Sequence, residues 1–157
     1  MTDAAPRPRR RAAGPLAAGA VALALVLAGC AGTPDPVDAT VAPSDATSQD
    51  FCAAYDLGLG EDNPTDAPVE TLVDALRASG VALADAGTPD DVPEPARAGF
   101  EVYAAAISAV SADQVRALRT ADTPRTRARA LGLGAGDAAR YRAFARYVAA
   151  TCFTPLP

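Results

Sequence analysis

The first 30 or so residues constrain this chain most, because they predict which part of it folds and in which compartment. A start rich in Arg precedes an uncharged run at 15–27 that is dominated by Ala, Leu and Val. About a dozen residues suit the apolar core of a signal peptide and are too few to span a bilayer comfortably. We therefore expect residues 1–29 to be removed as a signal peptide, and the exported remainder to form one domain.

The signal segment closes with Leu27-Ala28-Gly29-Cys30. With the basic start and the apolar run, these residues resemble the lipobox of a bacterial lipoprotein. The resemblance implies that Cys30 carries a thioether-linked diacylglycerol and anchors the chain to the extracytoplasmic face of the cell membrane. Two acyl chains give stable anchoring where one chain is marginal. The alternatives are an ordinary secretory signal, or a short buried helix that ends at an unrelated cysteine.

The part after the signal divides into a polar stretch and a helical region. Residues 30–47 are rich in Pro, Asp and Thr and lack apolar periodicity, so we expect the lipidated cysteine and a disordered tether there. Residues 48–157 hold apolar residues at helical spacing, and no stretch alternates long enough for a confident strand. We therefore predict an all-α fold, a small bundle of about four helices.

The expected helices begin near residue 48, near 67, after Asp91 and at Asp137 as an N-cap. Ser111 and Gln114 resemble a capping box that opens a further short segment, and residues 120–136 read as irregular. Gly80 lies on the apolar stripe of the second helix. We interpret it as a close-packing point inside one helix over 67–86, and the alternative is a helix break at Gly80.

Cys52 and Cys152 are the cysteines that remain once Cys30 is lipidated. An export compartment is oxidising, so we expect a disulfide that joins the first helix to the last. Closing so long a loop is worth about 4.7 kcal/mol in the chain-entropy model. The alternative is two unpaired buried thiols. Two cysteines without histidine make a poor zinc site, so we expect no metal.

Phe51-Cys52, the stretch from Ala86 to Tyr103, and the stretch from Tyr147 to Cys152 together resemble small helical lipoproteins of actinobacteria. The likeness covers about residues 50–153. It implies a helical exported domain and brings no reaction with it.

The charge is divided unevenly along the exported part. Residues 30–113 hold 16 acidic side chains and two arginines, whereas residues 114–157 hold two acidic side chains and eight arginines. Either the two halves pair with each other, or each faces its own partner. Arg125, Arg127 and Arg129 lie in the irregular segment, where side chains can converge, so we select them as the candidate anion-binding residues.

The absence of His and Lys excludes several kinds of catalytic site, namely Ser-His-Asp, Ser-Lys and Cys-His arrangements. Paired carboxylates remain, but the chain has no Trp and few aromatic residues on which a sugar could stack. The glycines at 132–136 do not have the spacing of a phosphate-binding loop. We therefore expect neither catalysis nor a cofactor.

Two functions stay open. The first is a non-catalytic binding or accessory module of the cell envelope, with an envelope protein or an anionic polymer as its partner and no role for nucleic acid. The alternative is a carrier for a small apolar or lipidic ligand held between helices. A cavity lined by Val69, Leu76, Phe100 and Tyr103 would favour the carrier.

Overall fold

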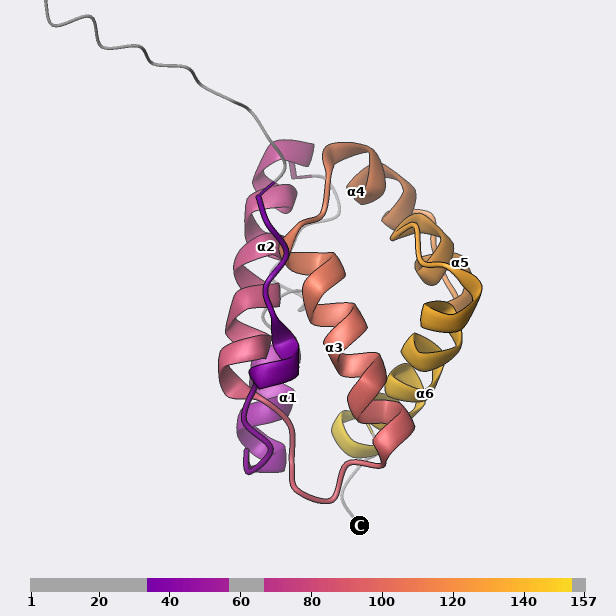
Figure 1. Ribbon diagram of the computed structural model, residues 1–157. Helices are drawn as coiled ribbons and strands as arrows, with labels where there is room; N and C mark the ends of the chain where they lie inside the picture. Colours follow the sequence, from indigo (N-terminus) through magenta and orange to yellow (C-terminus); the bar gives the residue numbers. More distant parts are fainter. Residues whose placement is uncertain (1–33, 57–66, 154–157) are drawn as a thin grey trace, which may run out of the picture. The chain divides into compact units, whose positions relative to one another are not determined.

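The computed structural model describes residues 34–56 and 67–153, and all regular secondary structure in these ranges is helical (Figure 1). The elements are η1 (Ala39–Val41), α1 (Ser48–Asp56), α2 (Val69–Ala86), α3 (Glu94–Ser108), α4 (Ala112–Leu118), α5 (Pro124–Ala130) and α6 (Ala135–Cys152). The predicted all-α class is confirmed. The predicted number of helices is too low, because α4 and α5 are separate helices in the described ranges.

Helix α5 corrects the expectation that residues 120–136 are irregular. Thr123 caps it: its hydroxyl accepts from the Thr126 amide, and the Thr126 hydroxyl accepts from the Thr123 amide in return. Pro124 occupies the first turn, where a missing amide hydrogen costs nothing. Ala128 then buries its side chain in the core. The signal that sequence reasoning missed is this capping pair, with Thr in the place usually taken by Glu or Gln.

The capping box at the start of α4 is confirmed. The Ser111 hydroxyl accepts from the Gln114 amide, and the Gln114 side chain accepts from the Ser111 amide. Gln114 also donates from Nε2 to the Leu131 carbonyl at 2.9 Å. This bond ties the start of α4 to the end of α5.

The long helices pack through small residues. Helix α3 packs against both α2 and α6. A Cβ atom at Gly80 would lie 2.5 Å from the Ser108 backbone nitrogen, and one at Gly99 would overlap the Arg140 carbonyl. The absent side chains therefore allow α2 and α6 to approach α3 closely. Because α2 continues through Gly80, the prediction of one unbroken helix is confirmed.

Aromatic rings from α1, α3 and α6 form the centre of the core. Phe51, Phe100 and Phe144 have no exposed surface. Phe144 makes edge-to-face contacts with the other two, at centroid distances of 6.2 and 6.0 Å. Such pairs add about 0.5–1.5 kcal/mol each beyond burial of their area.

The predicted disulfide is confirmed. Cys52 of α1 and Cys152 of α6 are bonded with an S–S distance of 1.97 Å and a Cα–Cα distance of 5.4 Å. The bond fixes the short helix α1 on the last helix, next to the contact that Phe51 makes with Phe144.

The N-terminal segment differs from the disordered tether expected over 30–47, because residues from Val37 onward pack on the helices. The Val37 amide donates to the Ser108 hydroxyl at 2.9 Å, and Ala39 is 2% exposed. Thr88 exchanges backbone hydrogen bonds with the segment, donating to Pro43 and accepting from Ala46. Backbone hydrogen bonds and a few small apolar contacts therefore hold the segment in place.

Several predicted features lie outside the described residues. They are the signal peptide and the lipobox with Cys30. Within the described ranges, no helix combines the length and apolar character needed to cross a membrane.

Candidate anion-binding site

The structure does not bring Arg125, Arg127 and Arg129 together. Because α5 is helical, residues two apart point to different sides of it. Arg125 and Arg129 are exposed, whereas Arg127 is half-buried and donates from Nε to the Ala121 carbonyl at 3.2 Å. The expected convergence depended on an irregular backbone, which α5 replaces.

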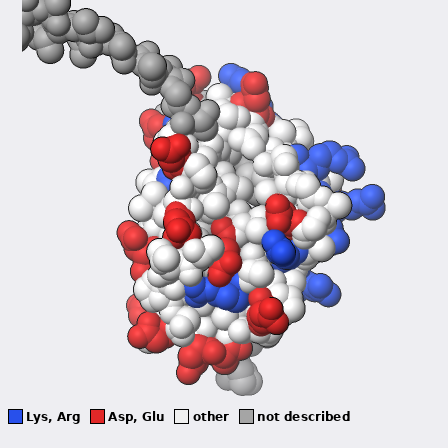
Figure 2. All heavy atoms as spheres, in the orientation of Figure 1, with Lys and Arg blue, Asp and Glu red and all other residues white. Residues whose placement is uncertain are grey.

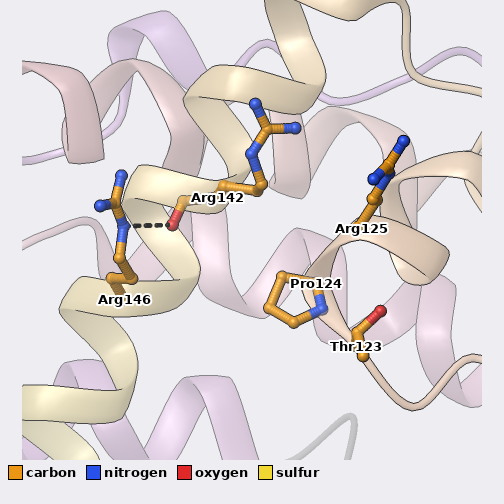
Figure 3. A pocket seen from close by; sticks show the side chains of 5 residues that line it. All are labelled: Thr123, Pro124, Arg125, Arg142 and Arg146. Atoms are coloured by element: carbon orange, nitrogen blue, oxygen red, sulfur yellow. Dashed lines mark hydrogen bonds between the residues drawn. The ribbon is translucent and has the colours of Figure 1, made fainter.

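Arg125 instead shares a groove with two arginines of the last helix, Arg142 and Arg146 (Figure 3). Thr123 and Pro124 complete its lining, and its volume is about 390 Å³. In Figure 3 the two α6 arginines lie across from Arg125, with Pro124 between them. We call this feature the arginine groove.

The amphipathic character of α6 explains why it presents arginines here. Tyr141, Phe144 and Val148 are buried on one face of the helix. Arg142 and Arg146 are exposed and lie one turn apart, so they share another face. Arg146 also donates from Nε to the Arg142 carbonyl at 3.3 Å (Figure 3).

The start of α6 differs slightly from the prediction. Gly134 is the N-cap and the helix begins at Ala135, two residues before the N-cap expected at Asp137. Asp137 therefore lies in the first turn, where a carboxylate favours the positive end of the helix dipole. There it forms an ion pair with Arg140 at 3.2 Å.

The groove arginines have no acidic partner among the described residues. Each ion pair found there joins two residues of one helix: Arg97–Glu101, Arg116–Asp113 and Arg140–Asp137. In the view of Figure 2 the acidic side chains gather mainly on one side and arginines project from the other. The ion pairs among the described residues are therefore local to single helices.

The groove is suited to binding an anion. A guanidinium group holds phosphate or carboxylate through paired hydrogen bonds, and three arginine side chains line this groove. Its volume falls within the range of small-molecule sites. The Thr123 hydroxyl is engaged in the cap of α5, and in the described part of the chain no three His, Cys, Asp or Glu side chains are grouped to hold a metal.

A second, smaller cavity of about 110 Å³ lies between the helices. Leu76 and Tyr103, which were expected to line a carrier cavity, do line it, whereas Phe100 is buried in the aromatic core and Val69 is not part of the lining. The remaining lining residues are Ile107, Leu118, Arg127, Leu131 and Tyr141.

The tyrosines around this cavity are held in their neutral form. Burial raises the pKa of Tyr103 well above its ordinary value, and the neighbouring Tyr55 and Tyr141 add to the effect. Burial also raises the pKa of Tyr141, although the Arg127 cation and its hydrogen bond to the Tyr141 side chain act in the opposite direction. Their hydroxyl groups therefore remain protonated at neutral pH.

Comparison with known proteins finds no matching family model, and no curated protein or solved structure with significant similarity to this chain.

Proposed function

We propose that this protein is an exported lipoprotein, anchored through Cys30, whose helical domain is a non-catalytic binding module of the cell envelope. Its ligand is an anionic polymer that the arginine groove recognises. The observation that supports this most is the grouping of Arg125, Arg142 and Arg146 around one groove, without an acidic partner in the described part of the chain.

The packed N-terminal segment supports a location close to the membrane. Pro34, where the described chain begins, lies four positions after Cys30, with three residues between them. An extended chain advances at most about 3.6 Å per residue, so about 14 Å at most separates these two residues. A domain held that close to a lipid anchor meets polymers at the membrane surface first.

The anchor is tested by intact mass. The protein purified from cells that express the full chain should start at Cys30 and carry a lipid adduct there. Cys30→Ser should abolish the adduct and release the protein from membranes. A wild-type protein that begins at another residue, or that begins at Cys30 without lipid, would contradict the anchor and leave the groove proposal standing.

The groove is tested by binding to poly(glycerol phosphate), with neutral dextran as the negative control. The test variant combines Arg125→Ala, Arg142→Ala and Arg146→Ala. The matched control combines Arg116→Ala, Arg129→Ala and Arg140→Ala, which removes the same charge from exposed positions outside the groove. Vesicles with and without anionic lipid show whether lipid headgroups compete for the same site.

The size of the inner cavity counts against a lipid carrier. Its volume of about 110 Å³ is well below the 300–1,000 Å³ or so of typical ligand pockets. A lipid chain does not fit this space. A carrier role is therefore not our proposal, although a much smaller ligand is considered below.

A further inference from the structure

Arg127 is a half-buried cation whose partners in the described chain are neutral. Its Nε donates to the Ala121 carbonyl at 3.2 Å, and its side chain is hydrogen-bonded to Tyr141. No acidic side chain among the described residues forms an ion pair with it. Withdrawing a charge from water is costly unless an opposite charge compensates it. The site thus presents an uncompensated positive charge.

This charge lies at the edge of an apolar cavity where five helices meet. Leu76 from α2, Ile107 from α3 and Leu118 from α4 line it together with Leu131 at the end of α5. The rings of Tyr103 and Tyr141 stack at 5.6 Å and form a further wall. The cavity therefore combines an aliphatic and aromatic lining with a single cation.

The tyrosines do not supply the missing negative charge. Burial keeps Tyr103 and Tyr141 protonated at neutral pH, so their hydroxyls act as neutral hydrogen-bonding groups. An anion that pairs with Arg127 would therefore come from outside this set of residues. A carboxylate matches the planar fork of a guanidinium group.

We propose that this cavity binds a small monocarboxylate with a short apolar chain. The carboxylate pairs with Arg127, and the chain lies among Leu76, Ile107 and Leu131. A dry cavity of about 150 Å³ accepts benzene, so one of about 110 Å³ suits roughly four to six heavy atoms. Longer fatty acids are excluded by size.

This site is distinct from the arginine groove and does not rest on the proposed function. Arg125 contributes to the groove, whereas Arg127 lines the inner cavity. One short helix thus contributes a cation to each site. Binding of a carboxylate at Arg127 and binding of a polymer at the groove can be lost separately.

Butyrate is the probe. Three control ligands test its features separately: acetate lacks the apolar chain, butan-1-ol lacks the charge, and octanoate is too large for the cavity. The protein is purified from cells that express the full chain. Saturation-transfer NMR reports contact with the ligand methyl group, and tyrosine emission is a second readout because the chain has no Trp. We expect saturable butyrate binding, with each of the other three at least about tenfold weaker.

Arg127→Gln should weaken butyrate about tenfold to a hundredfold and leave butan-1-ol unchanged, because only the charge-assisted bonds are lost. Arg129→Gln is the matched control, since Arg129 is exposed on the same helix, and it should bind butyrate like the wild type. Leu118→Phe should block both butyrate and butan-1-ol by filling the cavity.

Absence of saturable butyrate binding overturns the proposal, as does equal weakening by the two arginine variants. Circular dichroism establishes whether each variant folds. If Arg127→Gln does not fold, Leu118→Phe decides: loss of butyrate supports the cavity, and retained binding contradicts it.

Discussion

Arg97 of α3 donates from Nη1 to the carbonyl oxygen of Pro43, 54 residues earlier in the chain, at 2.8 Å. The same guanidinium donates to the Ala42 carbonyl at 2.7 Å and to the Thr88 hydroxyl at 2.7 Å, and it pairs with Glu101 at 3.2 Å. Its Cζ atom lies 5.2 Å from the centre of the Phe100 ring. One side chain therefore joins the N-terminal segment, the α2–α3 connection and α3.

Replacing Arg97 by Ala should release the N-terminal segment from the helices. We expect the free energy of unfolding to fall by about 1–3 kcal/mol, since the partly buried Ala42 carbonyl and the buried Thr88 hydroxyl lose a charged donor. Hydrogen exchange should accelerate at the amides of Val37, Ala46 and Thr88, which the packed segment protects. Arg97→Lys keeps the positive charge but loses the planar set of guanidinium donors. It should therefore recover part of the protection of these amides from exchange. Unchanged exchange at these three amides in the Ala variant would contradict the account.

The disulfide should contribute a large part of the stability of the domain. It closes a loop with a sequence separation of 100 between Cys52 and Cys152. Loss of a native disulfide from a small exported domain costs about 2–5 kcal/mol, which corresponds to a fall in Tm of about 10 °C or more. Thermal unfolding of Cys152→Ala, and of the wild type with and without reductant, measures this. Equal Tm values in all of these samples, or two free thiols in protein taken from cells, would refute the prediction.

Alkaline pH should destabilise the fold. Burial raises the pKa of Tyr55 to about 12 and that of Tyr103 well above its ordinary value, so the unfolded chain loses these protons more readily than the folded chain. The stabilisation is complete below about pH 10, the ordinary tyrosine value, and is lost as the pH rises toward 12. Urea denaturation at pH 8, 10 and 11 should show a steady fall over the last interval.

Tyr55→Phe separates this effect from a general alkaline change. The variant removes one hydroxyl whose pKa is raised by burial. Its stability should therefore fall less steeply between pH 10 and 11 than that of the wild type. Absorbance of tyrosinate, followed in the same samples, links the loss to ionisation. Identical slopes for the two proteins would assign the effect to other groups.

Local pattern was enough to predict part of the fold. The Ser111–Gln114 capping box and the unbroken helix through Gly80 follow from spacing and residue type. The Cys52–Cys152 bond follows from the expected export compartment and the count of cysteines. The packed N-terminal segment could not be predicted in this way, because backbone groups hold it to Ser108, Thr88 and Arg97, far away in the sequence.

The candidate site was predicted only in part for a related reason. Proximity in sequence grouped Arg125 with Arg127 and Arg129, but the rotation of α5 turns Arg127 to another side of the helix. The arginines that lie next to Arg125 come from α6, and only the packing of α5 on α6 brings them there. A helical projection of residues 124–130 would have shown that Arg127 points away from the other two.

The most direct test of the central claim is the affinity for poly(glycerol phosphate), measured at one stated low salt concentration and again at high salt. Wild type and the control variant lacking Arg116, Arg129 and Arg140 should bind alike, and binding should weaken with salt. The variant lacking Arg125, Arg142 and Arg146 should bind at least about tenfold more weakly at an unchanged Tm. Equal loss in the two triple variants, or no difference between the groove variant and wild type, would contradict an anion-binding role for the groove.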